Sequence, residues 1–126
     1  MKLPYGGGSF DFGVMTLVLF FVPDPRKGVS ELARVTRSGG TVASYTWDIV
    51  RGGIPTQPVW DKLQQLGRAV ARPPSADVSR FEVLKSLWAE LGLLEIETRE
   101  LVVERTFTDF EDYWTSMVVR QSIGDR

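Results

Sequence analysis

An uncharged apolar run, Phe12–Val22, restricts the fold of this chain more than any other feature. The run is rich in Val, Leu and Phe and does not alternate between apolar and polar positions, which is typical of a strand buried on both faces of a parallel sheet. A short buried helix is the alternative, but Gly13 and several β-branched residues favour the strand. Pro23 and Pro25 then end it, because proline has no N–H group to donate to a neighbouring strand.

The residues after the run predict a helix and then a second strand. Pro25 suits the first turn of a helix, and apolar side chains recur at helical spacing from Val29 onwards. Gly39 and Gly40 are expected to end the helix, since glycine adopts the left-handed conformation of a helix C-terminus without steric cost. Thr41–Tyr45 is then a second short strand. A strand, a helix and a strand in one sheet form a right-handed crossover, so the sequence predicts an α/β fold.

The same unit predicts where a ligand binds. In open α/β sheets, ligands bind beyond the carboxyl ends of the parallel strands. Phe20 and Phe21 come at the end of the first predicted strand. Tyr45, Trp47 and Asp48 come at the end of the second. We therefore expect an aromatic-lined crevice with one carboxylate at this end of the sheet. A core position for the two phenylalanines and a covering role for the tryptophan are the alternatives.

The rest of the chain predicts three helices and a long strand. Pro58 opens a helix with apolar residues every three or four positions, and a second helix covers Ser79–Glu90. Leu94–Phe107 is rich in strand-forming residues and is predicted as a strand. Thr108 or Asp109 can then cap a last helix.

Composition excludes several kinds of site and partner. The chain has 126 residues, an ordinary size for one domain, and a net charge of −1 with no basic block, so nothing favours nucleic acid or an anionic membrane. It has no cysteine and no histidine, which excludes disulfides, thiolate nucleophiles and metal sites built on these side chains. No run is long enough to span a bilayer, and no targeting signal is visible, so a cytoplasmic location is expected. The tail Gln121–Arg126 is expected to fray.

Short segments spaced over most of the chain form a series: Leu3-Pro4-Tyr5, Gly8-Ser9-Phe10-Asp11, Val22-Pro23-Asp24, Glu31-Leu32-Ala33-Arg34-Val35, Arg37-Ser38-Gly39-Gly40, Tyr45-Thr46-Trp47-Asp48 and Phe110-Glu111-Asp112-Tyr113-Trp114. In order and spacing, this series resembles the class I S-adenosylmethionine-dependent methyltransferases, in the branch that acts on small molecules. The resemblance implies a partial Rossmann-like, methyltransferase-type sheet with flanking helices, in a single domain that covers residues 1–126.

The resemblance also implies the cofactor S-adenosylmethionine and methyl transfer to a small molecule. In that family, a glycine-rich loop after the first strand holds the methionine end of the cofactor, and an acidic residue after the second strand holds the ribose. Both lie upstream of the segment similar to Leu3-Pro4-Tyr5. Gly6-Gly7-Gly8 is no substitute, because it precedes a strand, whereas a cradling loop leads from a strand into a helix. We therefore expect the C-terminal half of a truncated methyltransferase domain, incomplete on its own, that binds the cofactor weakly or not at all.

The expected site residues follow from the resemblance and from the strand ends. The cofactor side is assigned to Phe20 and Phe21. The acceptor side is assigned to strand-end residues and to two aromatic residues near the C-terminus: Tyr45, Trp47, Asp48, Tyr113 and Trp114. No catalytic residue and no metal ligand is assigned, because methyl transfer from a sulfonium is a direct displacement in which the protein mainly supplies position and a dry site. Closing the core is the alternative role of the last two aromatic residues.

Two classes of function stay open. One is a methyltransferase-family protein whose missing half comes from another chain, or whose activity has been lost. The other is a non-catalytic module that self-associates or binds a small molecule. The absent glycine-rich loop favours the second class, and the aromatic residues at the strand ends favour the first.

An open sheet edge predicts a homodimer. In the resembling fold, the strand Phe12–Leu19 lies in the middle of the sheet, beside strands that are missing here. Its edge and the neighbouring apolar face would then be exposed, which natural proteins avoid. A twofold dimer through this edge or face is the simplest remedy. Exchange of the strand Leu94–Phe107 between two copies is a second route.

Overall fold

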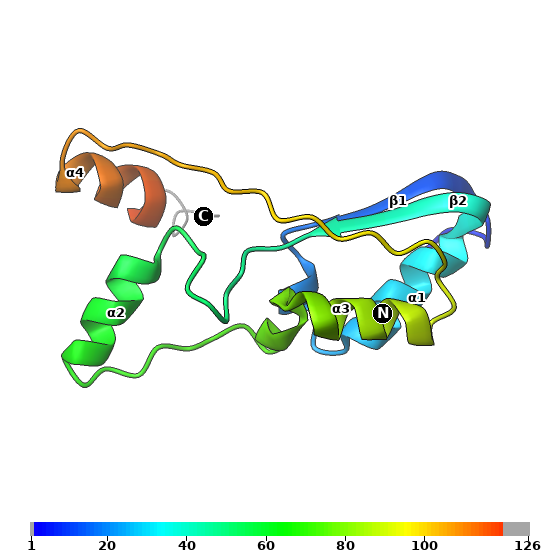
Figure 1. Cartoon of the computed structure of the whole chain (residues 1–126), viewed down its shortest axis with the longest axis horizontal. Coiled ribbons are helices and arrows are strands. Elements are labelled where there is room, and N and C mark those ends of the chain that lie inside the picture. Colours follow the sequence, from blue (N-terminus) through cyan, green and yellow to red (C-terminus); the bar gives the residue numbers. More distant parts are fainter. Residues whose placement is uncertain (1, 120–126) are drawn as a thin grey trace. The chain divides into compact units, whose positions relative to one another are not determined.

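The computed structural model describes residues 2–119 (Figure 1). Its helices and strands follow in the order β1 (Phe10–Thr16), α1 (Pro25–Val35), β2 (Thr36–Tyr45), α2 (Gln57–Gln65), α3 (Phe81–Glu90) and α4 (Phe110–Tyr113). Short 3-10 turns cover Leu19–Phe21 and Ala76–Ser79, and a π-helical turn, Trp114–Val119, follows α4. Contacts divide the chain into two compact units, Met1–Gly53 with Ala71–Thr98 and Ile54–Val70 with Arg99–Arg126. The tail that was expected to fray, Gln121–Arg126, lies outside the described residues.

The first unit is built on a parallel β-α-β connection. β1 and β2 form a two-stranded parallel sheet in which Thr16 lies opposite Tyr45. α1 connects the two strands and packs against both. Asp24 caps this helix, because its carboxylate accepts a hydrogen bond from the backbone N–H of Lys27 at 3.0 Å. The arrangement confirms the predicted α/β fold with a partial sheet and flanking helices.

The apolar core of the described residues lies in the first unit. Its buried side chains are Leu19, Phe20, Val29, Leu32, Val35, Ile49 and Val78. Gly13 lets α1 approach the sheet closely, because a Cβ atom at this position would lie 2.6 Å from Thr36 Oγ1 and 2.9 Å from Leu32 Cδ1. Protein interiors are too densely packed to absorb such an atom without movement. The glycine therefore sets the spacing between helix and strand.

The predicted strand Phe12–Val22 is wrong in its second half. β1 ends at Thr16, and Leu17 turns the chain with a φ angle of 53°, a left-handed conformation that is uncommon outside glycine. The Leu17 N–H donates to the Tyr45 carbonyl at 2.9 Å. The following residues form a 3-10 turn, in which Leu19 and Phe20 are buried in the core. Periodicity alone does not distinguish a long buried strand from a strand followed by a buried turn.

The predicted helix end at Gly39 and Gly40 is also wrong. α1 ends earlier, where the Thr36 hydroxyl donates to the Leu32 carbonyl at 2.9 Å, and β2 begins at once. Both glycines lie inside β2, at an irregularity of the β1–β2 register. Gly39 has a φ angle of 74°, and a Cβ atom on Gly40 would lie 2.7 Å from the Asp11 carbonyl oxygen. The glycines therefore allow two strands to approach closely and do not form a helix terminus.

The predicted strand Leu94–Phe107 is not a strand in the structure. Figure 1 shows this segment as a plain trace between α3 and α4. Several of its apolar side chains are largely exposed: Leu94, Leu101, Val102 and Val103. A strand needs a neighbour to satisfy its backbone N–H and C=O groups, and the sheet of the described residues contains β1 and β2 alone. A composition rich in strand-forming residues was therefore not sufficient to make this segment a strand.

The remaining predicted helices are confirmed with shifted ends. α2 has Pro58 in its first turn. α3 begins at Phe81, because Ser79 belongs to the preceding 3-10 turn. Asp109 caps α4 by accepting a hydrogen bond from the Asp112 N–H at 2.9 Å. Among residues 2–119, the helices are all too short or too polar to cross a membrane.

Candidate functional site

The carboxyl ends of β1 and β2 lie side by side. Thr16 pairs with Tyr45, and the N–H of the next residue, Leu17, donates to the Tyr45 carbonyl. The 3-10 turn after β1 and the turn after β2 therefore leave the sheet at the same end. This is the end at which parallel α/β sheets bind their ligands.

The adjacent phenylalanines after β1 have opposite environments. Phe20 is 3% exposed and belongs to the core, whereas Phe21 is 60% exposed, with the two ring centroids 4.6 Å apart. Ser75 holds this turn, because its N–H donates to the Phe20 carbonyl at 3.1 Å and its hydroxyl donates to the Val22 carbonyl at 2.7 Å. Of the two rings assigned to the cofactor side, that of Phe21 is available at the surface. The cofactor role of both stays a prediction.

The residues after β2 form a tight turn. Tyr45 is 55% exposed, while Trp47 and Asp48 are half-buried. The Asp48 carboxylate accepts a hydrogen bond from the Arg51 N–H at 3.2 Å, and the Asp48 carbonyl accepts one from the Gly53 N–H at 2.7 Å. The carboxylate therefore already has a structural task in this turn, beside the ligand role predicted for it.

Tyr113 and Trp114 lie in the second unit, in an aromatic cluster of their own. The Tyr113 hydroxyl donates to the Pro55 carbonyl at 2.9 Å, and its ring meets Phe107 edge-on at 5.2 Å. Trp114 stacks on Phe110 at 5.8 Å. Partial burial raises the pKa of the Tyr113 hydroxyl. The structure thus gathers the predicted site residues into two groups, one in each unit.

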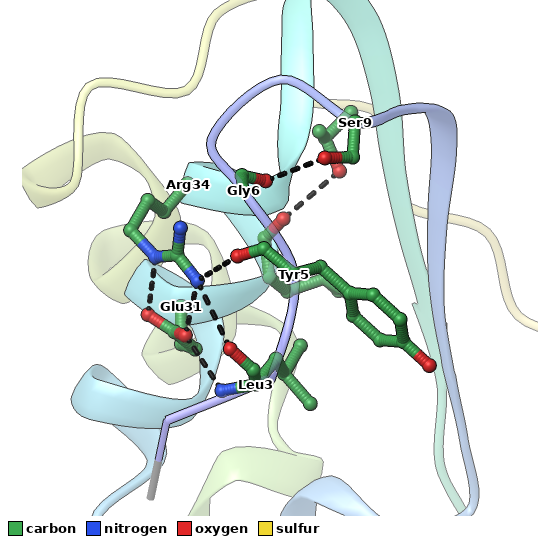
Figure 2. A network of polar contacts seen from close by, with 8 residues as sticks. Leu3, Tyr5, Gly6, Ser9, Glu31 and Arg34 are labelled. Atoms are coloured by element: carbon green, nitrogen blue, oxygen red, sulfur yellow. Dashed lines mark hydrogen bonds and ion pairs between the residues drawn. The ribbon is translucent and has the colours of Figure 1, made fainter.

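A polar network that was not predicted from the sequence ties the N-terminal segment to α1 (Figure 2). Arg34 and Glu31 form a bidentate ion pair, with Nη2 to Oε1 at 2.6 Å and Nε to Oε2 at 2.8 Å. Glu31 accepts the Leu3 N–H at 2.7 Å, and Arg34 donates to the Tyr5 carbonyl at 3.0 Å. The Gly8 N–H in turn donates to the Arg34 carbonyl at 2.9 Å. The network fixes the course of the chain into β1.

The electrostatics of this network follow from its geometry. The hydrogen bond from Arg34 is the main cause that lowers the pKa of Glu31 to about 2, and the hydrogen bond from the Leu3 N–H is the next. Glu31 in turn raises the pKa of Arg34. Opposite charges three positions apart on a helix were the available signal in the sequence. That spacing does not reveal a backbone segment folded back onto the pair.

A shallow hollow lies between the start of α1 and α3. Its volume is about 530 Å³, and its charged lining residues are Asp24, Arg26, Glu82 and Glu90. Arg26 and Glu90 form an ion pair across it. The hollow includes none of the residues that were predicted to bind a ligand, so the candidate site stays at the carboxyl ends of β1 and β2.

Comparison with known proteins gives the class of the chain. Residues 1–44, which form the β1–α1–β2 unit almost to its end, match the family model described as a methyltransferase domain. The parallel unit and this match define an α/β domain of the methyltransferase type. The match, which covers 44 of the 126 residues, supports a class I S-adenosylmethionine-dependent methyltransferase.

Three relatives describe the likeness more closely. A demethylmenaquinone methyltransferase of Corynebacterium glutamicum is 35% identical over 80 residues, which are 60% of this chain and 35% of the relative. A demethylmenaquinone methyltransferase of Corynebacterium efficiens is 30% identical over 90 residues, 68% of this chain and 39% of the relative. An uncharacterised protein of Mycobacterium tuberculosis is 38% identical over 45 residues, 36% of this chain and 16% of the relative. The chain thus spans well under half the length of these relatives. No solved structure matches it.

The described residues do not by themselves fit the methionine and ribose ends of S-adenosylmethionine. A cradling loop leads from a strand into a helix N-terminus and uses glycine and free backbone N–H groups. The passage from β1 to α1 contains no glycine between Leu17 and Lys27. At the end of this passage, the Asp24 carboxylate accepts the hydrogen bond of the Lys27 N–H, so this N–H is not available to a ligand. The exposed ring of Phe21 is what this passage offers to a ligand.

Proposed function

We propose that this chain takes part in methyl transfer from S-adenosylmethionine to a small molecule and forms the acceptor side of the site. The observation that carries the proposal is the match of residues 1–44 to a methyltransferase domain. These residues build a parallel strand pair with exposed aromatic rings at its carboxyl end. In parallel α/β sheets this end is where ligands bind.

The proposed acceptor has a flat, apolar ring, such as that of demethylmenaquinone. The support is that the Corynebacterium relatives are demethylmenaquinone methyltransferases, together with the aromatic rings at the end of β2. Tyr45 is more than half exposed, and Trp47, two residues further along the chain, is half-buried. Aromatic side chains stack on flat rings with a preference worth about 0.5–1.5 kcal/mol per pair.

The donor side of the site is proposed to come from polypeptide other than residues 2–119. The passage from β1 to α1 offers no glycine loop, and the Asp24 carboxylate serves as a helix cap. Methyl transfer needs donor and acceptor held in line in a dry site, so these residues act together with the part that holds the donor.

A non-catalytic module is the second candidate. The lack of a glycine-rich donor loop among the described residues favours it. A chain without such a loop can still bind a small apolar ring at the strand ends. The two candidates differ in one respect: the first predicts methyl transfer when a donor cradle is supplied, and the second does not.

An exchange experiment separates the two candidates. In the Corynebacterium glutamicum demethylmenaquinone methyltransferase, the matched segment, 35% of that enzyme, is replaced by this chain. Mass spectrometry then follows the methylated product formed from demethylmenaquinone and S-adenosylmethionine. The proposal predicts product at a rate well above that of the enzyme with the segment deleted. A folded hybrid that binds S-adenosylmethionine and forms no product would contradict it and favour the non-catalytic module.

A further inference from the structure

A residue far along the chain holds the 3-10 turn that follows β1. Ser75 donates two hydrogen bonds to this turn, from its N–H to the Phe20 carbonyl at 3.1 Å and from its hydroxyl to the Val22 carbonyl at 2.7 Å. The last carbonyl groups of a helical turn lack partners within the turn, and Val22 is the residue that ends this one. Ser75 therefore satisfies the carbonyl groups of the two residues that flank Phe21.

The side chains on either side of Phe21 are packed as well. Phe20 is buried in the core. Val22 lies over Gly28 of α1, where an added Cβ atom would be 3.2 Å from Val22 Cγ1. The Phe21 ring packs against the ring of Phe20, with the centroids 4.6 Å apart, and stays exposed at the end of the sheet. The exposed ring is therefore carried by a short stretch of backbone whose neighbours on both sides are fixed.

Ser75 is itself anchored to the same unit of the chain. The 3-10 turn Ala76–Ser79 begins at the next residue and packs against the turn Leu19–Phe21. Val78 in this second turn belongs to the buried core. The hydroxyl of Ser75 is therefore presented from a packed segment, although 53 residues separate it from the carbonyl of Val22 to which it donates. A long-range bond of this kind orients the turn that receives it, because both of its ends are held.

We propose that Ser75 is a positioning residue for the ligand end of the sheet, where its two hydrogen bonds hold the Phe21 ring in the direction in which it stacks on a flat ring of a ligand. This role rests on the proposed function, and the flat ring is that of the acceptor or the adenine of S-adenosylmethionine. A side chain that is held before binding loses less conformational freedom when the ligand arrives. Loss of the Ser75 hydroxyl is therefore expected to weaken the binding of a flat ring roughly twofold to tenfold.

Fluorine NMR of a chain with 4-fluorophenylalanine at position 21 tests the positioning without a ligand. Ser75→Ala is expected to move the fluorine resonance toward its value in the urea-denatured chain, and Ser75→Thr, which keeps a hydroxyl, is expected to leave it in place. The matched control is Ser9→Ala, since the Ser9 hydroxyl donates to the Gly6 carbonyl at 2.8 Å before the start of β1. An unchanged resonance in a folded Ser75→Ala chain overturns the proposal. A resonance in the unsubstituted chain equal to that of the denatured chain also overturns it, and this result needs no substitution of Ser75.

Titration of the same labelled chain with 1,4-naphthoquinone and with adenosine separates the two sources of a flat ring. The chain has no cysteine that would react with the quinone. A saturable shift with the quinone assigns Phe21 to the acceptor, and one with adenosine assigns it to the donor. The dissociation constant of the probe that binds is expected to rise roughly twofold to tenfold in Ser75→Ala and to stay unchanged in Ser75→Thr and Ser9→Ala. Equal constants in the two alanine variants overturn the ligand role of Ser75. If neither probe shifts the resonance, the proposed function is contradicted at this end of the sheet, and the ring resonance alone decides whether Ser75 holds Phe21.

Discussion

Replacing Gly13 by alanine tests whether α1 packs on β1 as closely as the structure has it. The new Cβ atom would lie 2.6 Å from Thr36 Oγ1 and 2.9 Å from Leu32 Cδ1. Neither neighbour yields easily, because the Thr36 hydroxyl is held by the Leu32 carbonyl at 2.9 Å and Leu32 is buried. Overpacking of this kind costs about 1–3 kcal/mol, and the lower backbone entropy of alanine in the unfolded chain offsets about 0.5–1 kcal/mol of it. We expect a net loss of about 1–2 kcal/mol in the free energy of unfolding.

Urea denaturation followed by circular dichroism measures this loss. The matched control is Gly7→Ala, because a Cβ atom at Gly7 would lie 3.5 Å from the Arg34 carbonyl oxygen, an ordinary contact, and its expected effect is below about 0.5 kcal/mol. Thr36→Ala removes the nearest atom, so it should be less damaging in the Gly13→Ala background than in the native chain. Equal stability of Gly13→Ala and Gly7→Ala would refute the close packing of the β-α-β unit.

Further expectations concern the cofactor, the strand ends and the pH dependence of stability. The purified chain should bind S-adenosylmethionine and its demethylated product weakly or not at all, and a clear one-to-one heat at low micromolar affinity in titration calorimetry would contradict this. Trp47→Ala should weaken the binding of demethylmenaquinone, measured by fluorescence, while the thermal midpoint stays within a few degrees; an unfolded variant would place Trp47 in the core instead. The pKa of Glu31 falls from 4.5 to about 2 on folding, so the stability it contributes is complete above pH 4.5 and is lost as the pH falls toward 2. The difference in thermal midpoint between the native chain and Glu31→Gln should shrink over this range, and a constant difference would rule out the ion pair as its cause.

The parallel β-α-β unit was predictable because its signals are local. An apolar run, a proline at the first helical turn and helical spacing from Val29 onwards are each visible in the sequence. The ends of its elements were not predictable from these signals. Leu17 adopts a left-handed conformation that is not expected for a leucine. α1 ends at Val35, just before Thr36, although the glycines further along the chain are the stronger sequence signal for a helix end.

Features that depend on tertiary contacts were the ones missed. Phe20 and Phe21 are neighbours of the same type, and the orientation of one short turn buries the first and exposes the second. Leu94–Phe107 has the composition of a strand, but a strand also needs a partner. The contacts of Glu31 and Arg34 with the N-terminal segment likewise require the chain to fold back on itself.

The central claim is that ligands bind this chain at the carboxyl ends of β1 and β2. The most direct measurement compares kcat/KM for demethylmenaquinone in the hybrid enzyme carrying Tyr45→Ala or Tyr5→Ala. The two tyrosines are 55% and 51% exposed, and Tyr5 lies before the amino end of β1. Because Tyr45→Ala removes a stacking contact, kcat/KM is expected to fall roughly threefold to tenfold. For Tyr5→Ala, kcat/KM is expected to change by no more than about twofold. Equal values for the two variants would contradict the account.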